Sequence, residues 1–181
     1  RFNLGVDSVT DNGDKMGALV EMDFFGGALG NQTATNTYGV TLRHAYMYWN
    51  NWLAGQTWSN FMDPGSIPEA ADFVGPTDGV IFVRQAQIRY TKGGFSVALE
   101  NPETTLVGST SSDRGALPDL TLRYGWKGDW GTFGVGALAR QLKVDRPGHD
   151  DSSFAGGLPV GAKWLMGSND TLHYQLTGGE G

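Results

Sequence analysis

The chain has 181 residues, a formal net charge of −6 and no cysteine, which argues against a nucleic-acid binder and excludes disulfides and thiolate metal sites. It contains 28 glycines and 12% aromatic residues but only 18% charged residues, a composition that favours short strands and tight turns over long helices. No apolar run approaches the ~20 residues of a transmembrane helix, although the alternating strands of a membrane barrel would contain no such run either.

Apolar and polar residues alternate in about ten segments, and turn-forming residues separate these segments. Phe2, Leu4 and Val6 begin the first segment, and the Asn12-Gly13 pair that follows is typical of a hairpin turn. The predicted strands are residues 2–7, 16–24, 40–49, 52–61, 80–90, 95–100, 120–126, 133–144, 160–166 and 172–177. The sequence therefore predicts an all-β, antiparallel fold.

The predicted connections are alternately short and long. Short turns are expected at residues 11–14, 50–51, 92–94, 128–131 and 168–170, and long loops at 26–38, 62–79, 101–118 and 145–157. Outer-membrane β-barrels have short turns at one end and longer loops at the other. The alternation therefore favours a transmembrane β-barrel over a soluble sandwich, whose loop lengths would be more even.

The segment 62–79 interrupts the strand pattern. It holds three prolines, which a regular strand does not accommodate, and four acidic residues. The acidic residues are Asp63, Glu69, Asp72 and Asp78.

Basic residues recur on the polar face of four predicted strands. They are Arg89, Arg123, Arg140 and Lys163. Gln85 and Gln87 share the face of Arg89 and lie opposite apolar residues such as Ile88. In a wide barrel this face would meet water and the apolar face would meet lipid. The same pattern also fits the half-buried sheet of a soluble protein, so both alternatives are open at this point.

The segment 42–106 resembles the DcaP-like family of trimeric outer-membrane porins. The matching pieces are Arg43-His44-Ala45-Tyr46, Gly55-Gln56-Thr57, Asp72-Phe73-x-Gly75-Pro76, Arg84-Gln85-x-Gln87-Ile88-Arg89-Tyr90 and Ala98-Leu99-Glu100-Asn101-Pro102-Glu103. The resemblance implies a 16-stranded barrel in the Gram-negative outer membrane, surrounded by lipid and lipopolysaccharide. It also implies a homotrimer that passes small anionic solutes such as dicarboxylates. Residues 1–181 would then be part of a porin barrel, with 62–79 as a constriction loop folded into the lumen.

In such a pore Arg89, Arg123, Arg140, Lys163 and Arg43 would form a cationic wall, because arginine binds carboxylates bidentately and stays charged. Gln85 and Gln87 would line the same wall. The acids of 62–79 would face it and set a transverse field across the aperture. The alternative is that the bases merely solvate the lumen or are neutralised by Glu21, Asp23 and Glu100.

Other functions have less support from the sequence. Glu100 and Glu103 flank Asn101-Pro102 at a strand end, which is a poor setting for a glycosidase pair. His149-Asp150-Asp151 reads as a solvated loop rather than a metal site. We therefore expect no enzyme activity, no cofactor and no metal. The remaining alternatives are a soluble carbohydrate-binding β-sandwich and a barrel whose pore is blocked.

Overall fold

The computed structural model describes residues 1–24, 39–68, 80–105, 112–146, 149–167 and 169–181. In these residues the fold is all-β, and the one helix is a single 3-10 turn, η1 (Pro64–Ser66). No helix in the described part of the chain has the length and apolar character needed to cross a bilayer.

Ten strands form one antiparallel sheet, in which each strand pairs with its neighbours in chain order. These strands are β1 (Phe2–Val9), β2 (Lys15–Asp23), β3 (Thr41–Trp49), β4 (Trp52–Trp58), β5 (Arg84–Lys92), β6 (Phe95–Glu100), β9 (Asp119–Gly128), β10 (Gly131–Arg146), β11 (His149–Met166) and β12 (Asp170–Glu180). A separate two-stranded ribbon joins β7 (Glu103–Thr105) to β8 (Ser112–Arg114).

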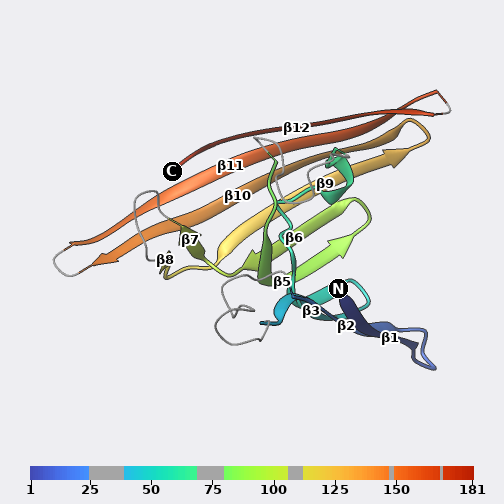
Figure 1. The fold of residues 1–181 in the computed structure, drawn as a ribbon, viewed down its shortest axis with the longest axis horizontal. Coiled ribbons are helices and arrows are strands. Elements are labelled where there is room, and N and C mark those ends of the chain that lie inside the picture. Colours follow the sequence, from blue (N-terminus) through green and yellow to red (C-terminus); the bar gives the residue numbers. More distant parts are fainter. Residues whose placement is uncertain (25–38, 69–79, 106–111, 147–148, 168) are drawn as a thin grey trace, which may run out of the picture.

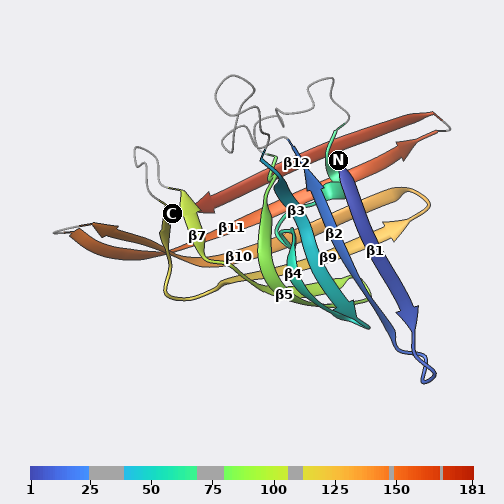
Figure 2. The same cartoon turned by 60° about the horizontal axis from the view of Figure 1, so that its bottom comes forward.

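The sheet curls without closing, and β1 and β12 are its two edges. The strand direction turns progressively, so that β1–β3 run across the direction of β10–β12 (Figures 1 and 2). Apart from the short β7–β8 ribbon, the described strands form no second sheet that could pack face to face against the first. The sandwich alternative is therefore wrong for this part of the chain.

The strand predictions hold in number and order, but several of the strands differ in extent. The predicted loop at 145–157 is wrong, because β10 and β11 continue through most of it and pair as far as Arg146 and His149. The predicted strand 52–61 ends at Trp58, where the chain leaves the sheet. The predicted loop 101–118 contains the β7–β8 ribbon.

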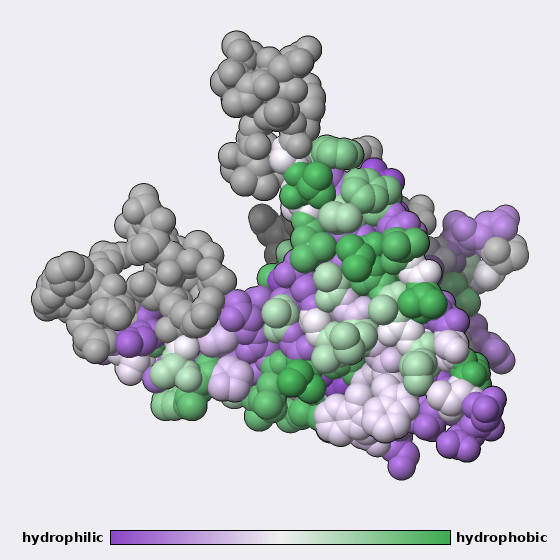
Figure 3. Space-filling view, turned by 90° about the horizontal axis from the view of Figure 1, so that it is seen from below, coloured by the Kyte–Doolittle hydropathy of each residue, from purple (hydrophilic) through white to green (hydrophobic). Residues whose placement is uncertain are grey.

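The two faces of the sheet invert the usual relation between polarity and burial. On β5, Gln87 is only 5% exposed whereas its neighbour Ile88 is 58% exposed. On β6, Leu99 is half exposed while Glu100 is buried. Hydrophobic residues spread over much of the surface seen in Figure 3. A soluble sheet buries its apolar face, so this sheet is arranged for an apolar environment outside and polar contacts inside.

Candidate functional site

The polar face of the sheet is crossed by residues 59–68, which we call the inner segment. The chain turns onto this face directly after β4, and the Ser59 amide still donates to the Val83 carbonyl at 3.1 Å. From there the segment contacts residues of β6, β9, β10, β11 and β12 in turn. We call this side of the sheet the inner face.

The first anchor of the inner segment is the carboxylate of Glu100 on β6. The Ser59 hydroxyl donates to its Oε2 at 2.6 Å, and the Asn60 amide donates to its Oε1 at 2.7 Å. The Thr121 hydroxyl on β9 donates to the same Oε1 at 2.9 Å. The Ser96 hydroxyl donates to the Asn60 side chain at 2.5 Å. These bonds fix the start of the segment to two neighbouring strands.

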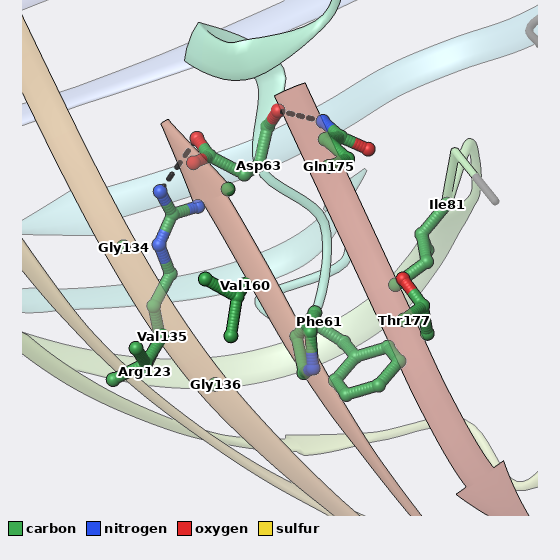
Figure 4. A pocket seen from close by; sticks show the side chains of 12 residues that line it. Phe61, Asp63, Ile81, Arg123, Gly134, Val135, Gly136, Val160, Gln175 and Thr177 are labelled. Carbon is green, nitrogen blue, oxygen red and sulfur yellow. Dashed lines mark hydrogen bonds and ion pairs between the residues drawn. The ribbon is translucent and has the colours of Figure 1, made fainter. Parts of the chain in front are cut away.

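The second anchor holds the helical turn η1 and the residues just before it. Arg123 on β9 forms an ion pair with Asp63 at 2.6 Å and donates to the Met62 carbonyl at 2.7 Å. Gln175 on β12 donates to the Asp63 carbonyl at 3.0 Å and to the Ser66 hydroxyl at 2.6 Å. Figure 4 shows Asp63 between Arg123 and Gln175. The segment therefore spans the inner face from β6 to β12.

Glycines give the inner segment its close approach to the wall. A Cβ added at Gly161 would lie 2.5 Å from the Ser66 hydroxyl oxygen and 2.9 Å from a carboxylate oxygen of Asp63. A Cβ at Gly157 would lie 3.0 Å from the Phe61 ring. The space left between segment and wall is about 10 Å³, room for about one water molecule. Sequence reasoning missed this surface, although glycines at alternating positions on paired strands were a readable signal.

Three of the bases expected on the wall are neutralised by acids. Arg123 pairs with Asp63 at 2.6 Å, and Arg140 pairs with Asp119 at 2.8 Å. Arg43 contacts Glu21 at 2.9 Å and Asp23 at 2.7 Å. For Arg43, Arg123 and Arg140 these contacts support the alternative, in which nearby acids neutralise the bases of the wall. The two acids that contact Arg43 are among those that the sequence suggests for this role.

A β-bulge explains how Arg43 reaches these acids. The register of β2 and β3 shifts between Glu21 and Met22, so that Glu21 pairs with His44 and Met22 pairs with Leu42. Arg43 is the extra residue opposite this step, and a bulge re-aims the side chain it inserts. Strict alternation would have put Arg43 and His44 on opposite faces.

Arg89 and Lys163 are different, because neither forms an ion pair with a carboxylate in the described part of the chain. Arg89 lines two adjoining hollows of the inner face, of about 440 and 350 Å³, which share Thr91 and Gly93. Lys127 lines the larger hollow as well. The register aligns Lys127, Thr132, Lys163 and His173 in one row across β9–β12.

Lys127 is a candidate that sequence reasoning missed, because the predicted strand ended at residue 126 whereas β9 continues to Gly128. Gln87 is buried and donates to the Trp58 carbonyl at 2.9 Å, where it supports the turn into the inner segment. Gln85 pairs with Thr57 on β4. Of the acids expected in 62–79, Asp63 is described above, and Glu69, Asp72 and Asp78 lie outside the described residues.

A family described as "DcaP outer membrane protein" matches residues 1–179. The chain belongs to this family. The resemblance seen in residues 42–106 is thus confirmed and extends over almost the whole sequence. The outer membrane is accordingly the location of this chain, and the inverted exposure of β5 and β6 has its explanation in a lipid environment.

A solved structure agrees with the DcaP assignment. The crystal structure of the outer membrane channel DcaP of Acinetobacter baumannii is similar, with a TM-score of 0.72 and 30% sequence identity. The match covers 92% of this chain and 48% of that channel, so the chain spans about half of its length. A search of curated proteins gave no significant match. The family is one of outer membrane proteins rather than enzymes.

Proposed function

We propose that this DcaP chain forms part of the wall of a porin through which small solutes diffuse passively, with a preference for anions, dicarboxylates included. The observation that carries the preference is a set of inner-face cations, Arg89, Lys127 and Lys163, that form no ion pair with an acid of the described residues. Family membership and the match to an outer membrane channel support the porin function.

The residues would act by their charge and by where they lie. Arg89 and Lys127 line the hollow beside the inner segment, so an anion passing the segment would meet both. Asp63 is the acid of the inner segment, and Arg123 neutralises it. The transverse electric field next to Asp63 is therefore weaker than the field predicted from the sequence, in which four free loop acids would face five free bases. In this proposal residues 62–79 narrow the lumen, and the complete protein is a homotrimer surrounded by lipid and lipopolysaccharide.

The test is the reversal potential of the full-length, detergent-purified protein in a planar bilayer under a salt gradient. We expect an anion-selective wild type and a reversal potential that moves toward zero in Arg89→Gln, because one uncompensated positive charge is lost from the hollow. Arg89→Gln/Lys127→Gln should move it further.

Lys92→Gln is the matched control, since Lys92 ends the same strand at an exposed position. It should leave the reversal potential unchanged. A cation-selective wild type would contradict the proposed preference while leaving a porin. A protein that inserts but never conducts would favour the blocked barrel.

A further inference from the structure

Glu100 is a buried carboxylate that solute passage itself does not require. Its side chain lies at the start of the inner segment, and the residue is only 3% exposed. Both of its oxygens accept hydrogen bonds, from Ser59, Asn60 and Thr121. Burial of a carboxylate is costly unless such bonds satisfy it. These three bonds satisfy the Glu100 carboxylate and tie it to the start of the inner segment.

We propose that Glu100 is the positioning residue that fixes the root of the inner segment and thereby sets the width of the passage beside it. The inference rests on the proposed porin function, and it assigns Glu100 no contact with the solute. Ser59 and Asn60 are the first residues after β4, so their hydrogen bonds to Glu100 determine the direction in which the segment leaves the wall.

The bonding pattern explains why this position requires a glutamate. A carboxylate offers only acceptors, and the three groups around it are all donors. Hydrogen bonds to a charged acceptor are also stronger than those between neutral groups. Thr121 and Asn60 continue the network, because the Asn60 side-chain amide reaches the Thr121 carbonyl at 3.4 Å. Loss of the carboxylate would remove the bonds of the Ser59 hydroxyl and the Asn60 amide. The root would then keep only the Ser59–Val83 backbone bond and the Asn60 side-chain bonds to Ser96 and Thr121.

The first test is Glu100→Gln, which keeps the size of the side chain but turns one acceptor into a donor. We expect a larger mean single-channel conductance and more frequent current steps than in the wild type. Thr121→Val, which removes one of the three donors, should give a smaller change in the same direction. Glu180→Gln, at an exposed position of β12, is the matched control and should behave as the wild type.

A disulfide lock separates positioning from general stability. The chain has no cysteine, so Ser66→Cys/Gly161→Cys would contain a single possible disulfide. The Cβ added at Gly161 lies 3.1 Å from the Ser66 Cβ, a few tenths of an ångström short of the usual ~3.5–4.5 Å range for disulfides, so the cross-linked protein with Glu100 intact is the reference for the cross-linked Glu100→Gln protein. With the lock oxidised, the conductance should be the same with and without Glu100→Gln. Under mild oxidation, Glu100→Gln should lower the yield of the cross-link.

Two results would overturn the inference. One is a folded Glu100→Gln protein with wild-type conductance and wild-type cross-link yield. The other is a raised conductance that the oxidised lock leaves unchanged, which would place the effect away from the segment. The proposed anion preference is tested independently of Glu100, because it is measured by the reversal potential and not by the conductance. The cross-link yield reports the position of the segment even in a protein that does not conduct.

Discussion

Gly161→Val should displace the inner segment from the wall and so change the pore more than any charge substitution. The added Cβ would lie 2.5 Å from the Ser66 hydroxyl oxygen, a distance that real Cβ contacts do not show. Ser66 is fully buried, and its hydroxyl is held by hydrogen bonds to Gln175 and to the Asp63 carbonyl. Overpacking of this kind typically costs about 1–3 kcal/mol. The structure can avoid that cost only if η1 lifts away from β11.

The measurements for Gly161→Val are the urea midpoint of the protein in lipid and the single-channel conductance. We expect a lower midpoint and an altered, noisier conductance. Gly178→Val on β12 is the control, since nothing lies within 4 Å of a Cβ at that position. If Gly161→Val and Gly178→Val behave alike in both measurements, the inner segment does not rest on β11 in the membrane.

The strands were predictable because their outer faces meet lipid, which forces a period of two onto the sequence. The turn at Asn50-Asn51 was predictable for a different reason: Asn50 adopts a left-handed conformation (φ 50°) that asparagine tolerates better than most residues. The continuation of β10 and β11 through residues 149–157 was not predictable. Residues 151–154 are exposed regardless of which face they lie on, so apolar and polar residues do not alternate there.

The bases of the wall could be recognised from the sequence, but their charge partners could not. Asp63 meets Arg123 only because the inner segment folds back past β5 and β6 to β9, and no local pattern encodes that contact. Arg43 reaches Glu21 because of a β-bulge, which inserts a single residue and cannot be recognised from the alternation of apolar and polar residues. Glu100 was read as a strand-end residue, because its role depends on donors about 40 and 21 positions away.

Arg140→Gln should destabilise the protein strongly, in contrast to Arg89→Gln, which should act mainly on selectivity. Arg140 forms an ion pair with Asp119 at 2.8 Å, and the Asp119 side chain is only 5% exposed. Removing one partner of a buried pair leaves the other charge uncompensated and costs about 3–5 kcal/mol. Arg89 forms no ion pair with a carboxylate in the described part of the chain, so its loss breaks no such contact. Equilibrium unfolding in lipid vesicles would measure the difference.

The double variant Arg140→Gln/Asp119→Asn separates the two effects of Arg140. If its role is to balance Asp119, removal of both charges should restore most of the lost stability, because two neutral side chains can still hydrogen bond to each other. If the role of Arg140 is instead to attract solutes, the double variant should also be as stable as the wild type, but its reversal potential should shift as far as that of Arg89→Gln. Ion pairing predicts the first result, since a neutralised pair contributes little net field to the lumen. The second result would return Arg140 to the cationic wall that the sequence predicted.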